Sequence, residues 1–240
     1  MLRLFVWFAF ARLPLLLMLV PPSVAIGQVP LGPPVDIAVT LNQPRGLATA
    51  DFDGDGDLDV VGISTTEGGI LWYENEDASV PGTGTGTEWQ RHPVAPEFGG
   101  DKVTTADVDA DGDMDVIAAS APANLVVWYS NDDVAGPGTG DGTTWTQNVV
   151  TQSFGSPFAA VPGDLDGDGD LDLVVLGSGA TDLVWYENVD VSGPGTGDGV
   201  TWAQSAIWGN FGSGQWARVI DFDGDGDLDV VAAAKQNYKL

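Results

Sequence analysis

Short apolar runs alternate with Asp/Gly-rich runs along most of the chain. Val60-Val61-Gly62-Ile63 and Leu173-Val174-Val175-Leu176 each follow directly after such an Asp/Gly run. Apolar runs of this length, rich in β-branched residues, favour buried β-strands. We therefore predict an all-β chain in which each Asp/Gly run joins one strand to the next.

The Asp/Gly runs are four copies of one motif, Asp-x-Asp-x-Asp-Gly-Asp-x-Asp. The copies span residues 51–59, 107–115, 164–172 and 221–229, so their starts are separated by 56, 57 and 57 residues. Such constant spacing indicates stacked copies of a single structural unit. We refer to the four copies as loops 1 to 4 and number the positions within each from 1 to 9.

The spacing of the aspartates indicates calcium. Calcium prefers six to eight oxygen ligands, and carboxylates at positions 1, 3 and 5 of a curled loop supply them. We expect position 7 to offer its backbone carbonyl and position 9 to close the site with a carboxylate, with one ion per loop. An Asp/Gly-rich solvated turn that binds nothing is the alternative. The candidate ligands are Asp51, Asp53, Asp55, Asp57, Asp59, Asp107, Asp109, Asp111, Asp113, Asp115, Asp164, Asp166, Asp168, Asp170, Asp172, Asp221, Asp223, Asp225, Asp227 and Asp229.

Two further positions define the motif. Position 6 is always glycine, whereas position 4 is Ala110 in one copy, so position 6 is predicted to need a backbone conformation that only glycine adopts easily. An EF-hand would place a glutamate at position 12 and continue into a helix, but position 12 is Gly62, Ala118, Val175 and Ala232. The loops are therefore predicted to join two strands.

Apolar side chains at positions 2 and 8 are expected to anchor each loop on the core. They are Phe52, Val108, Leu165 and Phe222 at position 2, and Leu58, Met114, Leu171 and Leu228 at position 8.

Other features recur with the same period. The segment that begins Trp72-Tyr73 returns at Trp128 and Trp185, and the Gly/Thr-rich segments 81–86 and 136–142 are predicted to be surface turns. Each unit then offers four short strands, which is typical of a propeller blade. A recurring Trp-Tyr pair favours packing between blades over a sugar-stacking platform.

The loops, the pairs Phe98-Gly99, Phe154-Gly155 and Phe211-Gly212, and the Trp-Tyr strands resemble the FG-GAP/VCBS-type repeats of bacterial secreted proteins. These are similar to the calcium-binding blades of the integrin alpha-subunit propeller. The resemblance covers roughly residues 35 to 234 and implies a β-propeller of about four blades whose aspartate loops are structural calcium sites. It departs from the family in the weak Gly-Ala-Pro element, of which Ala121-Pro122 is the nearest version, and in the small number of blades.

The N-terminus and the charge suggest where the protein acts. Residues 1–27 resemble a secretory signal, with the apolar run Leu13 to Val20 followed by small residues. An uncleaved anchor is the alternative, although Arg12 and Pro14 interrupt the apolar stretch. Residues 28–240 then form the propeller domain of a secreted or cell-surface protein. The formal net charge of −27 argues against nucleic acid as a partner.

The fourth unit is expected to lack its Trp-Tyr strand. Residues 35–40 align with the last strand of a blade, and by pairing with the fourth unit they would bring the ring closer to closure. We therefore predict a partial propeller: a fragment of a longer protein, a ring completed by another copy, or a four-bladed ring with a thin final blade. Exposed strand edges in an open ring favour self-association.

Two functions follow from these patterns. The first is a calcium-stabilised scaffold or accessory module that binds a protein or carbohydrate ligand on one propeller face. The second is a carbohydrate hydrolase or lyase, for which Glu74 and Glu187 would be the paired carboxylates. The single histidine, His92, is predicted to be an exposed strand residue, and the absence of cysteine excludes a thiol nucleophile.

Overall fold

The computed structural model of the protein describes residues 34–37, 41, 43–65, 69–76, 84–133, 135, 138–178, 183–190, 193, 195 and 197–235. All regular secondary structure in these ranges is β-strand. The predicted signal segment, residues 1–27, lies outside them. Residues 34–37 are described and are not part of a strand, and residues 38–40 lie outside the described ranges, so the predicted pairing of residues 35–40 stays a prediction.

The strands form three four-stranded sheets and one two-stranded sheet, all antiparallel, with sequential strands adjacent. The first sheet contains β1 (Pro44–Ala50), β2 (Asp59–Ser64), β3 (Ile70–Asn75) and β4 (Trp89–Ala95). The second contains β5 (Lys102–Ala106), β6 (Asp115–Ser120), β7 (Leu125–Asp133) and β8 (Gly140–Thr151). The third contains β9 (Pro157–Gly163), β10 (Asp172–Gly177), β11 (Leu183–Asp190) and β12 (Gly197–Trp208). The fourth contains β13 (Ser213–Ile220) and β14 (Asp229–Lys235).

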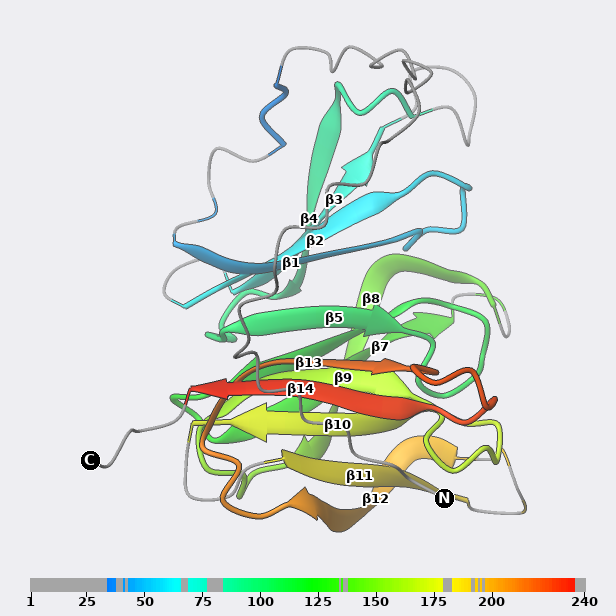
Figure 1. Cartoon of the computed structure of the whole chain (residues 1–240). Coiled ribbons are helices and arrows are strands. Elements are labelled where there is room, and N and C mark those ends of the chain that lie inside the picture. Colours follow the sequence, from blue (N-terminus) through cyan, green and yellow to red (C-terminus); the bar gives the residue numbers. More distant parts are fainter. Residues whose placement is uncertain are drawn as a thin grey trace, which may run out of the picture.

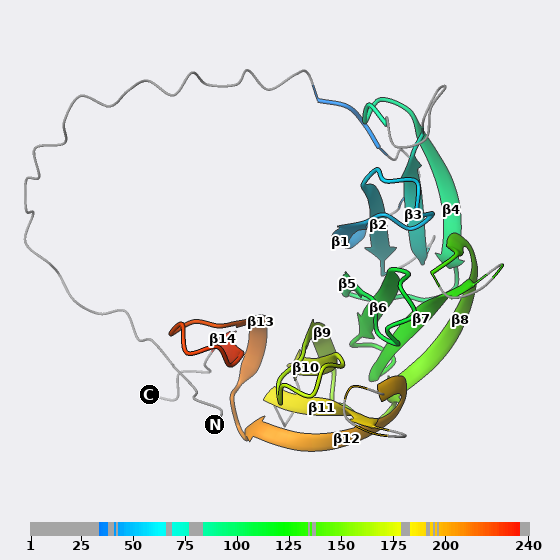
Figure 2. The same ribbon diagram turned by 90° about the vertical axis from the view of Figure 1, so that its right-hand side faces the viewer.

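The sheets are the blades of a partial β-propeller. Figure 2 shows them side by side around an open arc, with β1, β5 and β9 innermost and β4, β8 and β12 outermost. Each aspartate loop joins the first strand of its blade to the second, and all four loops lie along the right-hand side in Figure 1. The predicted fold class is therefore confirmed, including a fourth unit with only two strands among the described residues.

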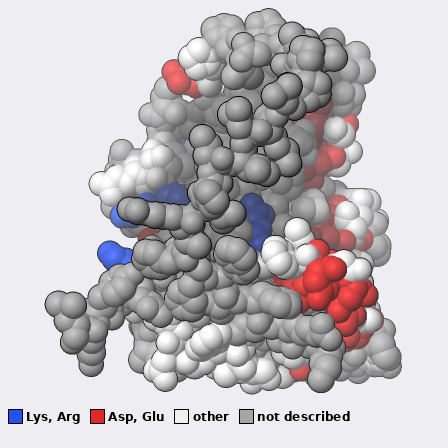
Figure 3. All heavy atoms as spheres, in the orientation of Figure 1, with Lys and Arg blue, Asp and Glu red and all other residues white. Residues whose placement is uncertain are grey.

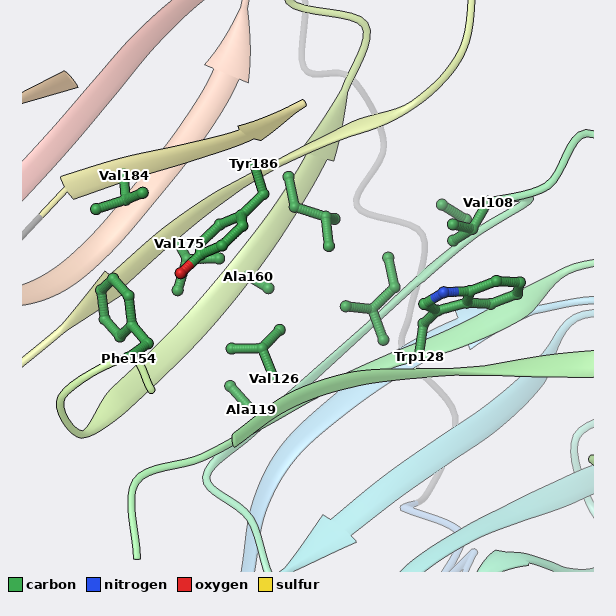
Figure 4. Packing of buried hydrophobic residues seen from close by; sticks show 12 residues of the cluster. Val108, Ala119, Val126, Trp128, Phe154, Ala160, Val175, Val184 and Tyr186 are labelled. Carbon is green, nitrogen blue, oxygen red and sulfur yellow. The ribbon is translucent and has the colours of Figure 1, made fainter. Parts of the chain in front are cut away.

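The hydrophobic cores lie between the blades. Because side chains alternate along a strand, Val116 and Ala118 of β6 pack against the first blade, while Ile117 and Ala119 pack against the third. Figure 4 shows the core between the second and third blades, where Trp128 and Val126 face Ala160, Val175 and Tyr186. The second and third blades therefore depend on both neighbours for the burial of their two faces.

The recurring tryptophans connect neighbouring blades, as predicted. The indole Nε1 of Trp72 donates to the Gly142 carbonyl in the next blade at 2.9 Å, and Trp128 donates to the Gly199 carbonyl at 2.7 Å. Both indoles are 1% exposed. The segment 136–142 is consequently not a simple surface turn as predicted, since Gly142 is buried and a Cβ there would lie 2.4 Å from the Trp72 ring.

The anchoring role of positions 2 and 8 holds only inside the arc. Phe52 and Val108 are 1% exposed, and Met114 and Leu171 pack in cores shared with the preceding blade. At the ends of the arc the prediction is wrong, because Leu58 is 64% exposed and Phe222 is 61% exposed. Position 8 packs toward the preceding blade and position 2 toward the following one, and among the described residues no blade precedes β1 or follows β14.

Candidate metal centres

Position 1 sets the curvature of each loop. Its carboxylate accepts the backbone N–H groups of positions 4 and 6 in loop 1, with Gly54 N at 2.9 Å and Gly56 N at 3.0 Å from the Asp51 oxygens. Loops 3 and 4 repeat this pair of bonds at Asp164 and Asp221. Two acceptor bonds from one side chain therefore wrap the backbone around the carboxylate, as the motif predicted.

Glycine at position 6 is required by the backbone. Its φ is +99° at Gly56, +106° at Gly112 and +109° at Gly169, which lies beyond the left-handed helical region that other residues tolerate. Position 4 is also left-handed, but Ala110 has a φ of only +58°. The sequence prediction for position 6 is thus confirmed, and position 4 accepts alanine because it occupies the ordinary left-handed well.

Position 9 is the buried end of the loop. Asp59, Asp115 and Asp172 are at most 1% exposed, and Asp229 is 6% exposed. Each carboxylate accepts the N–H of position 2 in its own loop, at 2.8 Å for Val108 and Asp115. In the first three blades its second oxygen accepts the N–H of the asparagine that follows the Trp-Tyr pair, as in Asn131 to Asp115 at 3.0 Å. Position 9 therefore links the loop to the third strand of its blade.

Position 7 has a contact that the sequence analysis did not predict. Its carboxylate accepts a glycine N–H from the hairpin between the third and fourth strands, from Gly140 to Asp113 at 2.6 Å and from Gly197 to Asp170 at 2.8 Å. Gly84 makes the same bond to Asp57. The recurrence of a glycine 27 residues after position 7 in loops 1 to 3 was the available signal. The expected ligand role of the position 7 carbonyl stays a prediction.

Three carboxylates converge in every loop. Oxygens of positions 1, 3 and 9 lie within 4.8 Å of one another in loops 1 and 2, and oxygens of positions 1, 3 and 5 do so in loops 3 and 4. The sets are Asp51, Asp53 and Asp59; Asp107, Asp109 and Asp115; Asp164, Asp166 and Asp168; and Asp221, Asp223 and Asp225. Each loop therefore brings together part of the predicted ligand set, and each cluster could hold a metal ion.

The first two clusters combine burial with like charges. Burial raises the pKa of Asp115 to about 8, against the opposing effect of its two backbone hydrogen bonds, and raises the pKa of Asp53, Asp59 and Asp109 to about 6. Neighbouring aspartates add to each rise, because adjacent negative charges disfavour ionisation. A bound cation would favour the ionised carboxylates and so would oppose the rise in pKa from both causes.

Loop 2 also contains an oxygen suited to a cation. Asp109 Oδ1 is buried without a hydrogen-bond partner among the described residues. A buried carboxylate oxygen normally has a partner, so an orphaned one within a carboxylate cluster is suited to bind a positive ion. The residues present therefore fit a hard divalent cation with oxygen ligands.

The candidate catalytic residues do not form a common site. Glu74 lies on β3 and Glu187 on β11, two blades apart. Glu74 instead pairs with His92 on β4, with Oε2 2.7 Å from Nε2, and the imidazole stacks on Trp72 with ring centroids 4.4 Å apart. His92 is thus partly buried at the outer edge of a blade, not exposed as predicted.

In the part of the chain that the structure describes, no helix has the length and apolar character needed to cross a membrane. A search of curated proteins finds no similar sequence. The model of the FG-GAP-like repeat, however, matches residues 51–118, 107–175 and 164–232. Each match begins at a position 1 aspartate and ends in the second strand of the next unit, so together they cover three consecutive loop-to-loop units. The chain therefore belongs to the FG-GAP-like repeat family.

Proposed function

We propose that the protein is a secreted, calcium-stabilised β-propeller module that serves as a binding scaffold. The observation that carries this proposal is the convergence of three carboxylates in each of four loops, at the junction of the first and second strands of every blade. A site repeated once per blade at equivalent positions is better suited to holding the scaffold together than to catalysis, which needs a single set of differing groups.

Calcium is the proposed ion because every side-chain ligand on offer is a carboxylate. Positions 1, 3 and 9 would hold it in loops 1 and 2, and positions 1, 3 and 5 in loops 3 and 4. Calcium accepts six to eight oxygens in flexible geometry, whereas magnesium demands a near-ideal octahedron and retains its water. Bound calcium would supply positive charge to carboxylates that otherwise repel one another by a few kcal/mol per pair.

The ion would act on stability through the loop. Without it, position 1 and position 9 carboxylates still accept backbone N–H groups, but they carry charges that burial disfavours. With calcium bound, the same carboxylates are paired with a positive ion, and this pairing exists only in the folded state. Calcium binding to the folded chain alone raises the free energy of unfolding by mass action.

Thermal unfolding with and without calcium tests this proposal. Chelator-treated protein should melt at a markedly lower temperature than calcium-loaded protein, and magnesium at the same concentration should restore little of the difference. The variant Asp107→Asn, which weakens one cluster, should need more calcium to reach the same melting temperature. An identical melting temperature in chelator and in calcium would overturn the proposal.

Secretion rests on the signal-like residues 1–27. Expression of the full chain in a bacterial host should yield mature protein outside the cytoplasm, and its N-terminal sequence should begin near Gln28. Retention of the intact N-terminus in the membrane fraction would favour the anchor instead.

A further inference from the structure

The concave face of the arc contains a groove of about 650 Å³. It is lined by residues of the first strands of all four blades, β1, β5, β9 and β13. Figure 2 shows β1, β5 and β9 on the inner side of the arc. A volume of this size suits a ligand of several sugar or amino-acid units. No residue of the aspartate loops lines the groove, so it is distinct from the candidate metal centres.

The charge of the groove differs from that of the rest of the molecule. The chain contains 35 acidic residues, yet none of the described residues that line the groove is Asp or Glu, while Lys102 and Arg218 both line it. In Figure 3, which has the orientation of Figure 1, the blue Lys and Arg atoms lie near the middle and left, and most of the red Asp and Glu atoms lie along the right-hand side where the loops lie. A chain with a strong net negative charge thus carries a locally cationic groove.

The two cations are held by aromatic rings. Lys102 Nζ lies 5.5 Å from the centre of the Phe158 ring, and the Arg218 guanidinium lies 5.6 Å from the centre of the Trp216 ring. Neither makes an ion pair with any described carboxylate. A cation–π contact orients a charge without neutralising it, so both charges remain available to a ligand.

These side chains also break the repeat. Trp216 occupies the register position five residues before its loop, where the other blades have Gly46, Lys102 and Ala159. Arg218 stands where the other blades have Ala48, Thr104 and Val161. At these register positions Ala48, Ala159 and Val161 pack toward the following blade. No described blade follows Trp216 and Arg218, so both side chains stay at the surface. Trp216 is 49% exposed.

We propose that this groove binds an oligosaccharide of uronic acids, with a pyranose ring on the Trp216 indole and its carboxylate on Arg218, and with Lys102 holding a second carboxylate. This rests on the proposed role of the protein as a binding scaffold. A flat apolar ring beside a guanidinium matches a sugar that presents a C–H face and a carboxylate together. An acidic peptide would use the cations but would have no comparable use for the exposed indole.

Titration calorimetry with tetragalacturonic acid, at a fixed calcium concentration, tests the proposal. The matched ligand is the same tetrasaccharide with its carboxylates methyl-esterified, which keeps the rings and removes the charges. We expect the acid to bind and the ester to bind at least tenfold more weakly. A glutamate tetrapeptide should bind more weakly than the sugar, and equal or tighter binding of the peptide would overturn the choice of ligand.

Variants separate the groove from the scaffold. Trp216→Ala should weaken binding about fivefold to tenfold, Arg218→Gln about tenfold, and Lys102→Gln about threefold. The matched controls are Trp208→Ala, an exposed tryptophan outside the groove, and Arg91→Gln on β4, and both should bind as the natural chain does.

All variants should keep the calcium-dependent rise in melting temperature, so a failure of the groove is distinguishable from a failure of the metal sites. No binding of the acid by a protein that calcium still stabilises would overturn the groove proposal alone. Equal losses in the control variants would also overturn it, because the effect would then not belong to the groove.

Discussion

Loops 2 and 4 have nearly the same sequence and very different surroundings. Loop 2 lies between two complete blades, and its Val108 and Asp115 are 1% and 0% exposed. Loop 4 precedes β14, with no described blade beyond it, and its Phe222 is 61% exposed while Asp223 and Asp225 are exposed. The nine-residue motif therefore fixes the local backbone, and the neighbouring blades decide how deeply its carboxylates are buried.

Burial changes what the same carboxylates contribute. In loop 2, burial raises the pKa of Asp115 to about 8 and that of Asp109 to about 6. Asp115 also holds two backbone N–H groups, from Val108 and Asn131, whereas Asp229 accepts one, from Phe222. We expect the inner loops to contribute most of the calcium-dependent stability and loop 4 to contribute least.

The largest expected difference comes from removing position 9. Asp115→Ala leaves two buried N–H groups without acceptors and should lower the free energy of unfolding in calcium by about 3–5 kcal/mol. Asp229→Ala removes one such bond at the end of the arc and should lower it by about 1 kcal/mol. Urea denaturation of both variants measures the difference, and equal losses would mean that the neighbouring blades do not matter.

Loop 2 should also make the stability of the calcium-free protein depend on pH. The folded, calcium-free protein keeps protons on Asp115 up to a pKa of about 8, whereas the unfolded chain releases them near 3.8. The folded state therefore binds more protons in this window, and the stability of the calcium-free protein should fall as the pH rises from about 4 to 8.

Asp115→Asn should remove the part of this fall above about pH 6, since Asp53, Asp59, Asp109 and Asp172 have a pKa of about 6. Chemical unfolding of the natural chain and of this variant at a series of pH values in chelator measures both slopes, and a stability that rises with pH would contradict the assignment.

Trp128 and Trp185 also compare a side chain that the next blade covers with one that no described hairpin covers, and the expected difference is smaller. Trp128 donates to the Gly199 carbonyl of the next blade, whereas no described hairpin covers Trp185. Burial raises the pKa of the nearby Asp172, and the Trp185 indole partly lowers it. The Trp185 Nε1 nevertheless makes no hydrogen bond to a described residue. Trp128→Phe should lower the free energy of unfolding by about 2–4 kcal/mol and Trp185→Phe by about 1 kcal/mol. Comparable losses would indicate that the Trp185 indole is covered as well.

The smallest expected effect is at position 4 of loop 2. Ala110 has a φ of +58°, so Ala110→Gly should raise the free energy of unfolding by up to about 1 kcal/mol. Gly112→Ala is the matched opposite, because its φ of +106° and the 3.3 Å approach of a Cβ to Gly138 Cα both oppose a side chain. It should lower stability by more than Ala110→Gly raises it, and a gain from both would contradict the backbone account.

The fold could be predicted from the sequence because the features that define each blade recur as short local patterns. Loop spacing, the strand after each loop and the invariant glycine at position 6 are local patterns, and all three hold in the structure. The exposure of Leu58 and Phe222 was not predictable from the motif, since it depends on which blade lies next to each side chain. Position 7 and the hairpin glycine are 27 residues apart, so their hydrogen bond depended on knowing the path of the blade.

The groove could not be predicted from the sequence for a similar reason. Lys102 and Arg218 are 116 residues apart, and only the arrangement of the first strands side by side brings them to one surface. Neither residue belongs to the repeated pattern, so the spacing of the repeats does not connect them.

Hydrogen exchange of the calcium-loaded and chelated protein, followed by mass spectrometry, tests the central claim most directly. If the loops hold the first and second strands together through calcium, chelation should speed exchange in β5 and β6 strongly and in β13 and β14 weakly. The outer strand β8 should change less than β5 and β6. Identical exchange in β5 and β6 with and without calcium would contradict the account.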